Sequence, residues 1–368
     1  MSNYDTIIDG LGEVLRAEHE RKVAPFVRKL EKAIDSEDID DIRDVISTFD
    51  LTAAYRARKA EVRHYNHLAF LFGVNRINPS ETAKSTQIGR PLNIIGTSTD
   101  QCEVMLAGGS NTIKAELTAE LNLMVDKLND LEHTGQKKER TSKADDPKQR
   151  ILLQFKERLV KTSKEGAGNL VSLVASLNMA RMSSYGFMNE ATLVGITHYK
   201  YNALDDSRTT DICNHLDGKV FPVDTAFTRL AQELRINDSD ELKAFAPFPI
   251  VNTPEALGEF TSLSSEELQA RGFSYPPMHF NCRSTVDYVK GTIQVAGLEI
   301  PTAATGLSEI LSTAEIRTLL QTVGLSAGTI DLAKGALLAG ASAIDVITDL
   351  AISYEALALI QALIDYDI

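Results

Sequence analysis

The sequence predicts an α+β fold that is predominantly helical, with a small antiparallel sheet in the central domain and helical segments at both ends. Three observations predict it. Apolar residues recur at helical spacing over residues 4–73 and 111–188. From residue 193 onward, β-branched and aromatic residues replace that spacing. Leu, Ile and Ala, divided by glycines into short stretches, dominate residues 300–368.

Length and composition limit the classes of protein that this chain can belong to. The 368 residues exceed the usual size of one domain, and 43% of them are hydrophobic, enough for a substantial core. The net charge of −13 argues against broad binding to nucleic acid. No apolar run reaches the ~20 residues of a membrane helix, no signal pattern opens the chain, and three cysteines make no disulfide framework. We therefore expect a soluble protein made in a cytoplasm.

Four segments are expected along the chain: an N-terminal helical region (1–73), an extended arm or linker (74–110), a central domain (111–290) and an acidic C-terminal helical module (300–368). Periodicity fails over 74–110, where Gly, Pro, Ser, Thr and Asn accumulate, and so long a loop usually has a function. We predict that this arm and the C-terminal module contact partners. The module has eight acidic residues against two basic ones.

The central domain is expected to begin with three helices. The first, over 111–132, has a single apolar seam: Ile113, Leu117, Leu121, Met124, Leu128 and Leu131. The others are expected over 151–162 and 170–189, and the last of them is rich in Ala, Ser and Met, which favours a central, buried position. A strand should follow over 193–203, and residues 216–221 read as a tight turn between short strands, with Gly218 at positive φ.

Two short clusters contain the residues suited to metal chemistry. Cys213 and His215 are two residues apart, and His279 and Cys282 are three apart. Zinc prefers thiolate and imidazole ligands, so two such pairs would make one closed tetrahedral site. If residues 213–215 are helical, His215 points away and three ligands remain. The alternatives are plain buried thiols, a Cys213–Cys282 disulfide, or a His279 that only bonds a backbone carbonyl.

A wider pattern surrounds both clusters. Besides Cys213, His279 and Cys282, it comprises Asp206, Arg208, Thr209, Leu216, Asp217, Gly218, Pro277, Asn281 and Arg283. This pattern resembles the signature of the Mu F-like family of phage minor head, or head-morphogenesis, proteins. The resemblance covers roughly residues 110–290 and departs from many relatives at Thr210 and Ser284, where they have cysteines. We expect Asp206 and Arg283 to connect the two clusters structurally.

The resemblance implies a non-enzymatic minor capsid protein of the virion, portal-associated or inside the head and made in the bacterial host cytoplasm. Its partners would be portal, major capsid or scaffold proteins, with packaged DNA as a neighbour and neither a membrane nor a small-molecule substrate. The alternatives are a metal-dependent enzyme and a Mu F-type toxin or effector carried in the particle. No catalytic zinc signature, P-loop or nucleophile elbow is present, and residues 300–368 contain no His or Cys.

Overall fold

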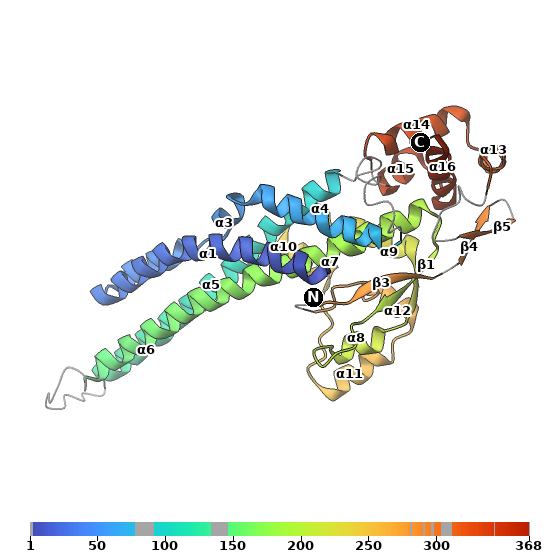
Figure 1. Cartoon of the computed structure of the whole chain (residues 1–368). Coiled ribbons are helices and arrows are strands. Elements are labelled where there is room, and N and C mark those ends of the chain that lie inside the picture. Colours follow the sequence, from blue (N-terminus) through green and yellow to red (C-terminus); the bar gives the residue numbers. More distant parts are fainter. Residues whose placement is uncertain are drawn as a thin grey trace. The chain divides into compact units, whose positions relative to one another are not determined.

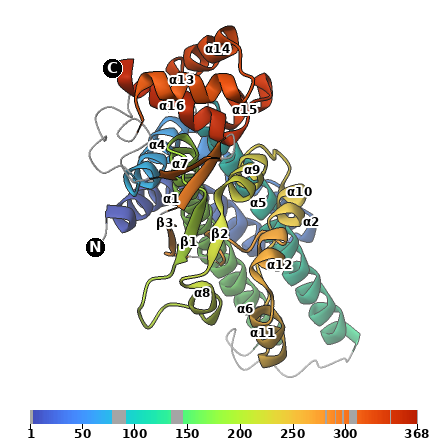
Figure 2. The same cartoon turned by 90° about the vertical axis from the view of Figure 1, so that its right-hand side faces the viewer.

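The computed structural model describes residues 3–77, 92–133, 146–279, 282–289, 291–295, 298–302, 311–341 and 343–367. Figures 1 and 2 show its helices and strands in two views. The contacts within the chain divide it into two compact units. The first unit contains Met1–Ile8, Val62–Gln101 and Ser176–Ile368, and the second contains Asp9–Glu61 and Cys102–Ala175. The predicted boundaries at 73 and 110 do not coincide with borders between these units, because residue 73 lies within Val62–Gln101 and residue 110 within Cys102–Ala175. The predicted fold class, helical with a small antiparallel sheet, is confirmed.

Helices make up the second unit, and four of them (α1, α4, α5 and α7) continue into the first. Local sequence explains several ends: the Asp38 side chain accepts backbone N–H bonds at the start of α2, and Asp146 does so at α6. The elements with residues in the second unit are α1 (Asn3–Ser36), α2 (Ile39–Ser47), α3 (Thr52–Arg56), α4 (Lys59–Asn75), α5 (Leu92–His133), α6 (Pro147–Lys161), the π-helical turn η3 (Thr162–Gly166) and α7 (Ala167–Leu193).

The prediction of an extended arm over 74–110 is wrong for residues 92–110, which form the first turns of α5. The rest of that stretch, 78–91, lies outside the described residues. Helical periodicity does exist there, but polar residues occupy part of the buried face: Ser98, Thr99, Gln101 and Ser110 are all buried. A pattern that counts only apolar residues therefore misses the helix.

A chain of hydrogen bonds connects two of these residues, Ser98 and Thr99, to polar side chains of α4 and α7 within the first unit. Ser98 Oγ donates to Asn178 Oδ1 over 2.7 Å, and the Asn178 amide donates to Asn66. Asn66 Nδ2 donates to Thr99 Oγ1 over 3.0 Å, and Thr99 donates to the carbonyl of its own helix at Ile95. Because every member has a partner, α4, α5 and α7 can bury polar side chains without the usual penalty.

The C-terminal part of α7 lies in the centre of the first unit, as its small residues predicted. Two glycines let its backbone touch that of α4. A Cβ at Gly186 would lie 2.1 Å from the Phe70 carbonyl oxygen, and one at Gly73 would lie 2.0 Å from the Ser183 carbonyl oxygen. No larger residue fits at either position.

A three-stranded antiparallel sheet, in the order β2-β1-β3, follows α7. Its strands are β1 (His198–Asn202), β2 (Val220–Pro222) and β3 (Thr285–Val289), and a separate hairpin joins β4 (Gly291–Val295) to β5 (Leu298–Thr302). Alternation places Tyr199 and Tyr201 of the central strand inward. The Tyr199 ring lies 6.5 Å from Phe187 of α7, so one face of the sheet packs on that helix.

The segment before Gly218 differs from the prediction of a turn between two strands. Residues Asp211–Leu216 form the helix α8, and only the β2 side of the turn is a strand. The Thr210 hydroxyl caps this helix by accepting the Cys213 N–H, and Asp211 suits its positive end. Gly218 has the expected positive φ of 73°.

The chain between β2 and β3 forms four short helices: α9 (Val223–Glu233), α10 (Ser239–Phe245), α11 (Pro254–Thr261) and α12 (Ser265–Ala270). The predicted capping box, Ser264 with Glu267, is present at α12. Glu233 at the end of α9 pairs with Arg181 of α7, and both side chains are at most 4% exposed. Tyr275 Oη donates to the same carboxylate over 3.0 Å. We call these three residues the ion centre.

The C-terminal module consists of α13 (Thr313–Thr322), α14 (Ala327–Leu338), α15 (Ala343–Leu350) and α16 (Tyr354–Asp367). Glycines end α13 and α14, as expected, with φ of 83° at Gly324 and 94° at Gly340. The module packs on the rest of the first unit: Asp345 accepts from Arg235 and Asn93, and Tyr354 bonds Thr228 over 2.7 Å. None of the described helices is both long and apolar enough to cross a membrane.

Candidate functional site

The two cysteine- and histidine-containing clusters meet beside the central strand. Cys213 Sγ lies 3.2 Å from His279 Nε2 and 3.9 Å from Cys282 Sγ. The three ligand atoms all lie within 4.8 Å of one another. The cysteines are buried at 1% and 2% exposure, and His279 is half-buried. We call these residues the Cys₂His cluster.

Local structure fixes each member of the cluster. Cys213 lies in the first turn of α8, with its N–H bonded to the Thr210 hydroxyl over 3.4 Å. Cys282 lies in the turn before β3, where its N–H donates to the His279 carbonyl over 3.3 Å. The three side chains therefore point at one place because a capped helix and a hydrogen-bonded turn hold their backbones.

His215 is not part of the cluster. Because α8 is helical, residues two apart diverge, which is the outcome that leaves three ligands. The His215 ring instead packs edge-on against Phe260 of α11, with 5.7 Å between centroids. Burial lowers the pKa of this imidazole. Cys102, the third cysteine, is a buried residue of α5 outside the cluster.

Two hydroxyl groups line the cluster, and sequence reasoning assigned neither of them a role there. Tyr201 Oη of β1 lies 3.4 Å from Cys213 Sγ and 3.7 Å from Cys282 Sγ. The side chain of Ser284 also hydrogen-bonds Cys213. In the sequence, the one pattern that pointed to Tyr201 was the alternation of tyrosines at 199 and 201, which places both side chains on the inner face of the strand.

The contacts within the cluster favour one thiolate. The hydrogen bond from Cys282, together with those from His279 and Ser284, lowers the pKa of the Cys213 thiol. The same contact, together with burial, raises the pKa of Cys282. Burial first, and then the neighbouring thiols, raise the pKa of Tyr201, so its phenol keeps a proton to donate. The cluster thus gathers a thiolate, a thiol and an imidazole, with a neutral hydroxyl between them.

The remaining motif residues support the backbone around the cluster. Asp206 accepts two hydrogen bonds from Arg283 Nη2, at 2.8 and 2.7 Å, which connects the segment before α8 to the segment before β3. The same carboxylate accepts the N–H of Arg208 over 2.9 Å, and the Thr209 N–H donates to the Asp206 carbonyl. The hydrogen bond from Arg283 is the main cause of the lowered pKa of Asp206.

The turn after α8 is attached directly to the central strand. Asp217 Oδ1 accepts the Ala203 N–H over 2.8 Å, and the Gly218 N–H donates to the Tyr201 carbonyl over 2.9 Å. Leu216 is fully buried. Pro277 follows Pro276, whose carbonyl accepts from Ser184 over 3.1 Å, and Asn281 lies outside the described residues.

Three chemistries can be compared for the converged residues: a disulfide, a nucleophilic pair and metal coordination. The cysteines are free, with their sulfurs 3.9 Å apart, so no disulfide joins them here. A nucleophilic pair of Cys213 and His279 has a suitable distance, but a sulfur on a residue with 1% exposure is inaccessible to a large substrate. The spacing of the sulfurs is also compatible with zinc coordination, because two sulfurs bound at ~2.3 Å in a tetrahedral site lie about 3.8 Å apart.

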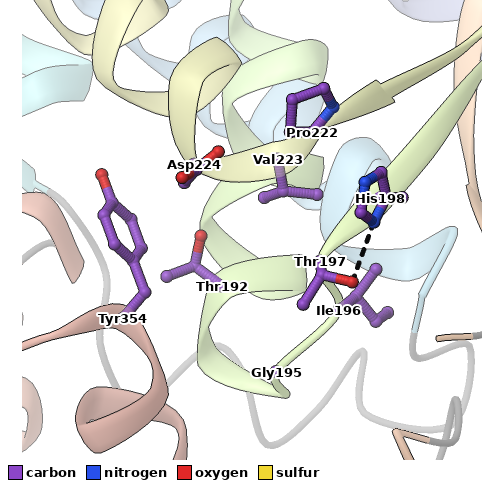
Figure 3. A pocket seen from close by; sticks show the side chains of 9 residues that line it. All are labelled: Thr192, Gly195, Ile196, Thr197, His198, Pro222, Val223, Asp224 and Tyr354. Atoms are coloured by element: carbon purple, nitrogen blue, oxygen red, sulfur yellow. Dashed lines mark hydrogen bonds between the residues drawn. The ribbon is translucent and has the colours of Figure 1, made fainter. Parts of the chain in front are cut away.

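A separate pocket of about 170 Å³ lies beside the start of β1 and contains none of the cluster residues (Figure 3). It is lined by Thr192, Gly195, Ile196, Thr197, His198, Pro222, Val223, Asp224 and Tyr354. His198 Nδ1 bonds the Thr197 hydroxyl over 3.0 Å. Small-molecule sites usually enclose about 300 Å³ or more, so this pocket is small for a substrate.

Of the comparisons with known proteins, the one with family models finds a match. Neither the curated proteins nor the solved structures include a match to this chain. The model of the family described as Phage Mu protein F like protein matches residues 151–287. That range begins in α6, ends within β3 and includes every member of the Cys₂His cluster. The resemblance predicted from the two motifs is therefore confirmed, and residues 151–287 form a Phage Mu F-like region.

Proposed function

We propose that this protein is a structural component of a phage head that acts in head morphogenesis. The observation that supports this most is the family match over residues 151–287. The geometry agrees with a structural role, because the motif residues join segments of backbone to one another. The pair of Asp206 with Arg283 and the turn at Asp217 and Gly218 are examples.

We further propose that the protein is part of the virion, next to the portal or on the inside of the capsid. Its partners would then be portal, major capsid or scaffold proteins, and packaged DNA would be a neighbour. The net charge of −13 favours protein partners over direct and extensive DNA binding. Residues 300–368 have a net charge of −6 (eight acids against two bases), which suits docking to a basic surface of such a partner.

Purified particles provide the first test. We expect peptides of this chain in washed, DNA-filled heads, cross-linked to portal or capsid proteins. A phage with a nonsense codon in this gene should yield few infectious particles, and a plasmid copy of the wild-type gene should restore them. Normal yield and normal heads without the protein would contradict the proposal.

A carried toxin or enzyme is the competing function. Expression of the full chain in host cells without phage separates the two. A structural component should leave growth unchanged, whereas an effector should slow or arrest it. Growth arrest that disappears in a Cys213→Ser variant would favour a nucleophilic role for Cys213 over the structural one.

A further inference from the structure

We propose that Cys213, His279 and Cys282 together bind one Zn²⁺ ion, which joins α8 to the turn before β3. The proposal concerns the chemistry of this site and does not depend on the role in the head. It starts from the ligand types: two sulfurs and one imidazole nitrogen, each with its ligand atom within 4.8 Å of the others.

The distances between these atoms match those around a tetrahedral zinc ion. The two sulfurs are 3.9 Å apart, against about 3.8 Å when both lie at ~2.3 Å from zinc. Cys213 Sγ and His279 Nε2 are 3.2 Å apart, against about 3.5 Å for a thiolate and an imidazole on one ion. Binding therefore requires a shift of only a few tenths of an ångström, so the site is largely preformed.

The surroundings favour metal binding over simple burial. A cysteine binds zinc as thiolate, and the cluster gathers hydrogen bonds on Cys213 that suit this form. The pair of Asp206 with Arg283, which connects the segments that carry the ligands, is satisfied internally, with Nη2–O distances of 2.8 and 2.7 Å. A divalent cation would supply positive charge at a place where the protein provides sulfur ligands.

The Tyr201 hydroxyl lies close to both sulfurs of the cluster. Its oxygen is 3.4 and 3.7 Å from the two sulfurs, and its side chain is fully buried. We assign it a positioning role, in which the phenol donates a hydrogen bond to a bound thiolate. Such outer contacts orient ligands and stabilise their charge.

The experiment uses the full chain, purified without a metal-affinity tag or chelator, and measures zinc by mass spectrometry. We expect about one zinc per chain. Titration of the metal-free protein with Co²⁺ should produce the sulfur-to-cobalt charge-transfer band and the visible bands of a tetrahedral site. Cys213→Ser, His279→Gln and Cys282→Ser should each lose the zinc and the tetrahedral cobalt spectrum.

Matched controls test whether the ion is specific. His215→Ala removes the histidine nearest in sequence to Cys213, and Cys102→Ser removes the cysteine outside the cluster. Both should keep about one zinc. If a ligand variant fails to fold, the cobalt titration of the wild-type chain still decides the matter, because it needs no substitution.

Two results would overturn the proposal. The first is less than about 0.2 zinc per chain together with no thiolate–cobalt band on titration, which would show that the cluster is held by hydrogen bonds alone. The second is zinc that remains in all three ligand variants, which would identify an adventitious ion bound elsewhere.

Discussion

The ion centre and the Cys₂His cluster are two buried polar sites of the first unit that satisfy their groups differently. In the ion centre, Arg181 faces Glu233, and Tyr275 donates to the same carboxylate, so opposite charges neutralise each other. In the Cys₂His cluster, the closest groups are two sulfurs and an imidazole, with no acidic partner in the group. The ion centre contains its own opposite charges, whereas the Cys₂His cluster is the site at which we propose that a cation binds.

Burial alone therefore does not identify a binding site. Both sites contain titratable groups that are largely buried, although His279 is only half-buried. The two sites differ in whether their hydrogen-bond donors, acceptors and charges are already paired with one another within the protein. The predictions below test that distinction.

The largest effect is expected from Glu233→Ala, which leaves the Arg181 guanidinium buried without its carboxylate. The free energy of unfolding should fall by about 3–5 kcal/mol. Urea unfolding followed by circular dichroism measures it. Replacing both partners, as in Arg181→Met with Glu233→Leu, should cost much less, because no charge is then buried.

Lys243→Ala, which removes an exposed pair with Asp240, is the control and should cost under about 1 kcal/mol. Equal losses in all three variants would show that the ion centre is not special.

Zinc removal should have the next largest effect. With free zinc at a thousand times its dissociation constant, binding adds about 4 kcal/mol to the free energy of unfolding. A chelator should remove this amount from the wild-type chain. Glu233→Ala should keep the same dependence on zinc, because the ion centre is a separate site. Cys282→Ser should unfold identically with and without zinc, and a dependence on zinc in that variant would contradict the assignment.

A smaller effect is expected from Tyr201→Phe, which removes one hydroxyl from the edge of the cluster. Zinc affinity should fall about tenfold, because the thiolate loses a hydrogen bond, while about one zinc per chain is still bound. Competition with a chromogenic chelator measures the affinity. Tyr288→Phe, on the neighbouring strand, is the matched control and should leave the affinity unchanged. Unaltered affinity in Tyr201→Phe would show that this phenol does not support the ligands.

The smallest effect concerns the exposed pair of Asp206 and Arg283. The Arg283 hydrogen bond lowers the pKa of Asp206 in the folded protein. A carboxylate with a lowered pKa adds stability that is fully present above its unfolded pKa of about 3.9 and is lost as the pH falls through the folded pKa. Asp206→Asn should therefore be less stable than the wild type at pH 7, and the gap should close below about pH 4. Thermal unfolding from pH 7 to pH 3 follows the difference. If the difference in stability between Asp206→Asn and the wild type persists at acid pH, it arises from packing and not from the charge of Asp206.

Regular patterns made much of the fold predictable from the sequence. The apolar seam from Ile113 to Leu131 lies in α5, and the composition of residues 170–189 predicted a central helix. The convergence of Cys213 with His279 and Cys282 followed from the motif. These features depend on residues whose type alone indicates their role.

The missed features depend on contacts that no local pattern encodes. Residues 92–110 are helical because Ser98 and Thr99 find polar partners on other helices. The helix α8 replaced a predicted strand because Thr210 caps it, and a threonine in a sequence does not reveal whether its side chain will accept a backbone N–H. Tyr201 joined the site because its strand is central, which depends on pairing with distant residues.

The strand order β2-β1-β3 also has a consequence for the timing of synthesis. A chain made from its N-terminus can pair β1 with β2 early, because the partners Tyr199 and Phe221 are close in sequence. The partner of Tyr199 on β3 is Tyr288, so that side of the sheet forms only after the intervening helices exist. Until His279 has been added, Cys213 has neither of its cluster partners. The nascent chain thus passes through a stage with an exposed edge on β1 and a single thiol beside it, and that stage ends when the second motif arrives.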